Sequence, residues 1–146
     1  MKLFLKTSII ALITVFCHVS WGQAIQDDEI SVLNQFQDAP NSSERFNIFF
    51  NSMDRYNVNS AYDWLDTIKI YLSNSQTTND SIALGQYKMM QAQIYNDLGD
   101  YDKSIALAKE LYVAKDSMDR TSIKIVLDVL DDNYANLQLY DKQIEI

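Results

Sequence analysis

The sequence has few of the residues that make sharp turns or bind transition metals. Its 146 residues include three glycines, one proline, one cysteine and one histidine. A many-stranded β fold needs frequent turns, and turns favour glycine and proline. Apolar residues also recur at helical intervals, as in Leu65, Ile68 and Leu72. The scarcity of turn residues therefore favours an all-α fold with long helices.

The N-terminal segment has the pattern of a secretion signal. Lys2 and Lys6 precede an uncharged apolar stretch over residues 7–19. Residues 20–24 then carry small residues at the spacing of a cleavage site. We expect residues 1–22 to be a cleaved signal peptide, with cleavage two residues later as an alternative. A membrane-spanning helix needs about 20 apolar residues, more than this stretch has. The mature protein is then periplasmic or extracellular, with no membrane insertion.

Cleavage would remove every thiol and imidazole, because Cys17 and His18 both lie in the signal. The mature chain would then have no disulfide, no cysteine–histidine zinc site and no nucleophile activated by histidine. A lipid anchor on Cys17 is disfavoured, since Phe16 stands where lipoprotein signals carry a small residue. We therefore expect no cofactor and no metal site.

Basic residues are in the minority. Without Lys2 and Lys6, 10 of the 12 basic residues remain against 20 acidic ones, a net charge near −10. Proteins that bind nucleic acid or an anionic membrane surface need a basic face, and lysine and arginine form no cluster here. We expect no nucleic-acid partner. The acidity favours solubility and any partner that is neutral or basic.

Tyrosines recur in pairs at a constant interval. The two members of each pair have a spacing of six, and the three pairs are Tyr56 and Tyr62, Tyr95 and Tyr101, and Tyr134 and Tyr140. The pairs define a 39-residue period, and aspartate follows the second tyrosine of every pair. Self-similarity at such a period is typical of a stacked array of similar units.

Turn and capping residues divide each unit into two helices. In the middle copy, Asn79 or Asp80 is the expected N-cap, Gly99 supplies the left-handed turn, and Asp100 is expected to cap the second helix. The expected helices span residues 44–56 and 61–73, then 81–98 and 101–115, then about 119–136. The corresponding organisation is an N-terminal helix and linker at 23–42, followed by repeats at about 43–78, 79–117 and 118–146, the last incomplete.

The segment from Ile94 to Ala106 resembles the tetratricopeptide repeat (TPR) family. Tyr95, Leu98-Gly99 and Tyr101 match the family's motif at the end of the first helix and through the turn into the second. Ala92 fits the small position where the two helices touch. The family proline is missing, the 39-residue period exceeds the usual 34, and Asp131 replaces the small residue in the third copy. The resemblance covers about residues 43–146 and implies antiparallel helical hairpins stacked as an α-solenoid.

The resemblance implies a non-catalytic scaffold that binds a protein or peptide on the first helix of each hairpin. Its register assigns ligand-facing positions to Phe50, Asp54, Asn57, Met89, Gln93, Asn96, Asp128, Asp132 and Ala135. None of these residues is basic, so a clamp for an acidic peptide C-terminus is not expected. A neutral or basic segment is the expected partner.

Two other functions stay open. One is the extracytoplasmic input segment of a longer signalling protein, such as a histidine kinase or a DNA-binding regulator. The other, more remote, is a fragment of a helical-array enzyme that uses paired carboxylates. No pattern orders two carboxylates into a cleft, and the aspartates at 97, 100 and 102 do not follow the EF-hand spacing. We expect no enzymatic activity.

In the 39-residue register, Ile146 falls inside a second helix rather than at its end. Stacked repeats normally finish with a polar capping face. We therefore expect either a natural chain that continues past Ile146 or self-association through this open repeat.

Overall fold

The computed structural model describes residues 30–52 and 58–144, and every regular element in those ranges is a helix. Residues 30–38 are helical. The elements that follow are α2 (Ser42–Ser52), α3 (Val58–Thr78), α4 (Ser81–Asp97), α5 (Tyr101–Val113), the 3-10 helix η2 (Lys115–Ser117), α6 (Arg120–Asn136) and α7 (Tyr140–Ile144). The all-α class is confirmed. The signal peptide at 1–22 lies outside the described residues.

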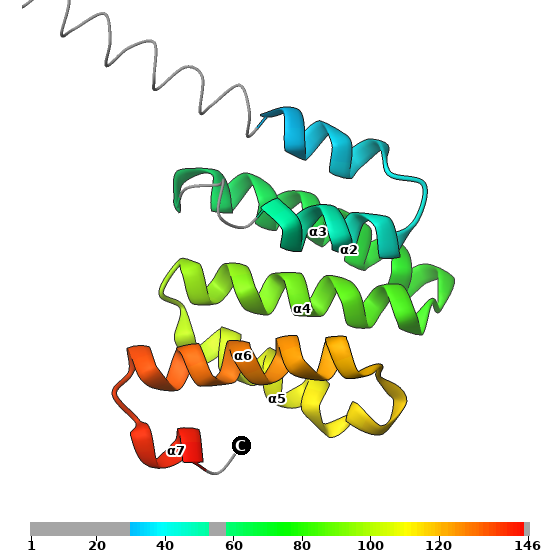
Figure 1. Ribbon diagram of the computed structural model, residues 1–146. Helices are drawn as coiled ribbons and strands as arrows, with labels where there is room; N and C mark the ends of the chain where they lie inside the picture. The colour runs from blue at the N-terminus through cyan, green and yellow to red at the C-terminus, as the bar shows by residue number, and fades with distance from the viewer. Residues whose placement is uncertain (1–29, 53–57, 145–146) are drawn as a thin grey trace, which may run out of the picture.

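The helices pack both on their sequence neighbours and on alternate helices. α4 packs against α3 and α5, and α5 packs against α6. α4 also contacts α2 and α6, so that it lies between the α2–α3 pair and the α5–α6 pair (Figure 1). The helix at 30–38 and α7 lie at opposite ends of this arrangement (Figure 1).

Side-chain caps begin α2, α4 and α6 at the predicted period. Asn41, Asp80 and Asp119 follow one another at one repeat period, and each accepts a hydrogen bond from the backbone amide three positions further on. The donors are Glu44, Ala83 and Ser122, at 2.8, 3.0 and 3.0 Å. Such a cap satisfies one of the amides that have no partner within the helix. The predicted cap Asp80 is confirmed, and Asp119 caps α6 in the same way.

α4 and α6 also end in the same way, at positions one repeat period apart. Gly99 and Gln138 have positive φ angles of 75° and 57°. The amides of Asp100 and Leu139 donate to the carbonyls of Tyr95 and Tyr134, both at 2.8 Å. A left-handed residue with this long-range bond is the Schellman motif that closes helices. The left-handed role predicted for Gly99 is confirmed.

Some predicted boundaries and one predicted cap are wrong. α3 continues to Thr78 rather than ending at Ser73, because no glycine or proline interrupts it before Asn79, whose φ of 57° ends the helix. Asp100 makes no side-chain cap to α5. Its carboxylate accepts a hydrogen bond from Lys103 at 2.5 Å instead.

An aromatic cluster fills the core between residues 30–38, α2 and α3. The Trp64 ring meets Phe36 and Phe49 edge to face, with centroids 5.1 and 5.3 Å apart. All three rings are buried. Edge-to-face contacts add to the stabilisation that burial of large rings provides. These rings form the hydrophobic core at this end of the described fold.

A buried chain of hydrogen bonds joins α4, α5 and α6. The Ser104 hydroxyl donates to the Ala92 carbonyl at 2.6 Å, and Asn133 Nδ2 donates to Ser104 Oγ at 2.8 Å. Asn133 Nδ2 also donates to the Val129 carbonyl at 2.6 Å. Ala92, Ser104 and Asn133 are at most 1% exposed. Only a small residue at 92 allows α5 to come this close, as the sequence predicted.

The next hairpin makes the equivalent bond with larger residues. Asp131 and Gln143 occupy the positions of Ala92 and Ser104 in the following repeat. Gln143 Nε2 donates to the Asp131 carbonyl at 3.3 Å and to its carboxylate at 2.9 Å. The departure of Asp131 from the family pattern is therefore matched by a longer partner on α7.

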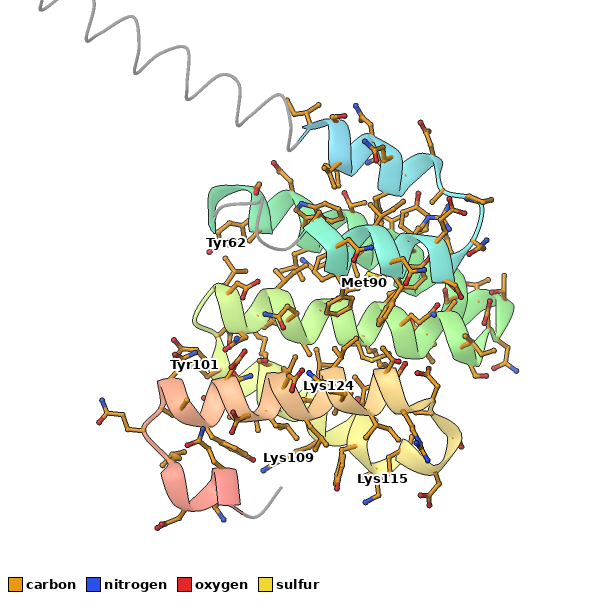
Figure 2. The ribbon with its side chains drawn as sticks, viewed as in Figure 1. Tyr62, Met90, Tyr101, Lys109, Lys115 and Lys124 are labelled. Carbon is orange, nitrogen blue, oxygen red and sulfur yellow. The ribbon has the colours of Figure 1, made fainter. Side chains whose placement is uncertain are left out.

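The periodic tyrosines do not share one burial pattern. Tyr95 and Tyr101 are both partly buried. Tyr62 is 62% exposed, whereas Tyr134 is 6% exposed. Tyr62 and Tyr101 lie at the same end of the molecule, beside the starts of α3 and α5 (Figure 2). The 39-residue period of the tyrosines therefore marks their position along each helical hairpin and does not indicate how deeply they are buried.

Two glycines should respond in opposite ways to alanine. A Cβ at Gly85 or at Gly99 would meet nothing within 4 Å. Gly85 lies inside α4, where alanine favours the helix by about 1 kcal/mol. Gly99 has the left-handed backbone, which costs an L-residue about 1–2 kcal/mol.

Gly85→Ala should therefore raise the free energy of unfolding by about 0.5–1 kcal/mol, and Gly99→Ala should lower it by about 1 kcal/mol. Urea unfolding followed by circular dichroism checks both. A loss of stability in Gly85→Ala would show that another helix covers this position.

Candidate peptide-binding surface

The contact between α4 and α6 brings together three of the predicted ligand-facing residues. Gln93 and Asn96 lie on α4, and Asp132 lies on α6. Asn136 Nδ2 of α6 donates to Asn96 Oδ1 at 3.3 Å. Gln93 Nε2 donates to Asp97 Oδ1 at 2.9 Å. These five residues define what we call the α4–α6 seam.

The seam is polar, but its two amides on α4 are largely covered. Gln93 and Asn96 are 7% and 9% exposed, respectively. Asp132 and Asn136 on α6 are exposed. A ligand would therefore contact the carboxylates and Asn136 first. Asn96 would act mainly by fixing the Asn136 side chain through their hydrogen bond.

Negative charge concentrates around Asp132. Partial burial raises the pKa of its carboxyl group above the ordinary value, and the neighbouring carboxylates of Asp131, Asp128 and Asp97 raise the pKa further. Asp132 as a whole is exposed, and its carboxylate lies close to other negative charges. These charges attract cationic groups.

Basic side chains balance little of this charge. Lys124 makes an ion pair with Asp128, one turn along α6. Figure 2 shows Lys109 and Lys115 along α5 and η2 instead. Their ammonium groups lie over the rings of Tyr134 and Tyr112, at 5.7 and 4.2 Å from the centroids.

Met89 is not a ligand-facing residue. It is 3% exposed and packs between helices with Leu111 of α5 and Val126 of α6. The prediction was wrong because α6 covers this side of α4. The neighbouring Met90 is also buried, in the interior of the molecule (Figure 2).

The remaining predicted positions divide into three groups. Phe50 is half-buried on α2, where its ring packs against Phe46 and Phe49 at centroid distances of 4.6 and 5.0 Å. Asp128 is paired with a lysine, and Ala135 is exposed on α6. Asp54 and Asn57 lie outside the described residues, so their position relative to the seam stays a prediction.

Asn136 is not among the predicted ligand-facing residues. The family register pairs Asn96 with Ala135, one repeat period later, whereas the hydrogen bond joins Asn96 to the next residue along the chain. This contact depends on how α4 and α6 are rotated about their axes. No spacing in the sequence carries that information.

Comparison of the chain with protein-family models, with curated proteins and with solved structures finds no match. Within residues 30–52 and 58–144, no cluster of three or more histidine, cysteine, aspartate or glutamate side chains could hold a metal ion. No helix in the same ranges has the length and apolar character needed to cross a membrane.

Proposed function

We propose that this protein is a non-catalytic scaffold of the TPR kind, exported to the cell envelope, that binds a protein or peptide. The observation that carries the proposal is the packing of α4 against both α2 and α6. In stacked hairpins, the first helix of each unit contacts the first helices of its neighbours and together they form one surface. The recurrence of caps and helix ends at the repeat period supports such stacking.

The chemistry of the seam favours a neutral or basic partner. Carboxylates at 97 and 132 attract ammonium and guanidinium groups, and the amides of Asn96 and Asn136 supply donors and acceptors for a peptide backbone. Exposed charges gain little energy in water, and salt screens them. Binding is therefore weak, and it declines as the salt concentration rises.

A fluorescent basic peptide tests the proposal by anisotropy, against an acidic peptide of equal length. Asp132→Asn should weaken binding of the basic peptide by about two- to fivefold at low salt, as expected for one exposed charge. Asn96→Ala should weaken it as well, because it removes the acceptor that orients Asn136. Asp116→Asn, an equal charge change at an exposed site in η2, should have no effect.

Tighter binding of the acidic peptide would contradict the assignment. Equal losses from Asp132→Asn and Asp116→Asn would show that only the net charge of the protein matters. Circular dichroism of each variant checks that the helices remain folded.

A further inference from the structure

A second site lies away from the α4–α6 seam, where the end of α3 meets the starts of α2 and α4. An open cleft there has a volume of about 330 Å³. Its walls carry the side chains of Arg45, Asp80, Tyr71 and Tyr87, together with uncharged polar groups that include Asn74 and Thr78. Small-molecule sites commonly have volumes of this order, with a few polar groups that fix the ligand.

Arg45 is held in place by three contacts. Its Nε donates to the Phe36 carbonyl at 3.1 Å, and Nη1 donates to the Tyr87 hydroxyl at 3.4 Å. The guanidinium lies 4.3 Å from the centroid of the Tyr71 ring. Tyr71 stacks in turn on Tyr87 and donates its hydroxyl to the carbonyl of Gln37 at 3.1 Å.

The fixed guanidinium has donors to spare. These contacts use two of its five N–H groups, and no carboxylate of the described residues lies within ion-pair distance of Arg45. A planar fork that packing already orients suits a carboxylate, because little side-chain freedom is lost on binding.

Asp80 supplies the opposite charge in the same cleft. Its Oδ1 caps α4 by accepting from the Ala83 amide at 3.0 Å, which leaves Oδ2 available. Asp80 and Arg45 do not pair with each other, although both line the cleft. Both act on Tyr87: burial raises the pKa of its hydroxyl, the bond from Arg45 lowers it, and Asp80 raises it. The two charges therefore flank Tyr87 without neutralising each other.

We propose that the cleft binds the zwitterion of a small polar amino acid, with its carboxylate on Arg45 and its ammonium group on Asp80. A molecule with both charges satisfies both side chains at once. Asn74 and Thr78 provide amide and hydroxyl partners for a polar side chain. Neither the acidic seam nor any peptide is needed for this binding.

Derivatives of the amino acids test the contributions of the carboxylate and of the ammonium group separately. Free L-serine, L-asparagine and L-glutamine are titrated into the protein and followed by amide chemical shifts, each beside its methyl ester and its N-acetyl derivative. The ester lacks the carboxylate, and the N-acetyl form lacks the ammonium group. At least one free amino acid should bind saturably, and both of its derivatives should bind about tenfold more weakly, as for the loss of one charged hydrogen bond.

Matched variants assign the contacts. Asp80→Asn keeps a good N-cap and removes the charge, so it should weaken the free amino acid about tenfold and leave the N-acetyl derivative unchanged. Arg45→Lys keeps the charge and loses the fork, so it should weaken both. Arg120→Lys, at an exposed position at the start of α6, should bind like the unchanged protein.

Three results would overturn the proposal. They are the absence of saturable shifts for all three amino acids up to about 10 mM, unchanged binding by Asp80→Asn, and equal affinity for an amino acid and its N-acetyl derivative. The last would reduce the site to a carboxylate site. If Arg45→Lys fails to fold, the derivatives and Asp80→Asn still decide the question.

Discussion

Asn133→Asp should lower the free energy of unfolding by about 3–5 kcal/mol at neutral pH, the cost of an unpaired buried charge. Asn133 is fully buried, and its amide nitrogen donates to Ser104 Oγ and to the Val129 carbonyl. A carboxylate oxygen there would face the Val129 carbonyl with no hydrogen to offer. The Ser104 hydroxyl already donates to Ala92. The new carboxylate oxygen would therefore face only hydrogen-bond acceptors and would have no donor to bond.

The loss should depend on pH in a defined direction. Burial raises the pKa of the new carboxyl group above its value in the unfolded chain, about 3.9. The folded state then holds a proton that the unfolded state releases, so stability falls as the pH rises above about 4, and levels off above the folded-state pKa. At lower pH, both states are protonated and the charge penalty disappears.

Urea unfolding between about pH 3 and pH 8 measures this dependence relative to the unchanged protein. Asn47→Asp makes the same chemical change at an exposed position in α2 and should leave stability nearly unchanged. If Asn133→Asp at neutral pH matches that control, the buried hydrogen-bond chain does not exist as described.

Ala92→Leu should cost about 1–3 kcal/mol, because it forces extra volume into a packed contact. Ala92 is 1% exposed, and the Ser104 hydroxyl lies 2.6 Å from its carbonyl oxygen. A leucine would push α5 away from α4 and stretch that bond. The cost is expected despite the good helix propensity of leucine.

Ala106→Leu is the matched control, since Ala106 is exposed on the following helix, α5. Its free energy of unfolding should change by no more than about 0.5 kcal/mol. Chemical denaturation of the two variants under one set of conditions makes the comparison. Equal stabilities would mean that Ala92 does not lie at the closest approach of the helices.

Local signals in the sequence predicted the starts of α4 and α6 and the left-handed turn at Gly99. Asp80 and Asp119 cap their helices through bonds to amides three positions away, and Gly99 acts through its own backbone angle. Such features need no knowledge of the rest of the fold. Asp100 failed as a predicted cap because Lys103, one turn away, offered its carboxylate a charged partner.

The candidate surface was harder to predict, because it depends on which side of each helix its neighbour covers. The family register placed Met89 beside Gln93 and Asn96, yet α6 buries Met89 and leaves Asp132 exposed. Arg45 gave no signal at all. Its neighbours in the cleft, Tyr71 and Tyr87, come from two later helices that only the packed fold brings together with it.

One clue in the sequence was present but needed the structure to interpret it. The change from alanine to aspartate at 131 and the change from serine to glutamine at 143 occur at matched positions of the repeat. Each change alone looks like a loss of the family pattern. Together they preserve a bond from the second helix of a hairpin to a carbonyl of the first.

The buried bond chain from Ala92 through Ser104 to Asn133 also bears on how the molecule opens. Separating any one of α4, α5 and α6 breaks a bond whose partners are sealed from water, and no solvent can replace it until the opening is wide. Partial fraying at this point is therefore unfavourable. The backbone amides near these three residues should exchange with solvent through one shared opening event, as a single cooperative unit.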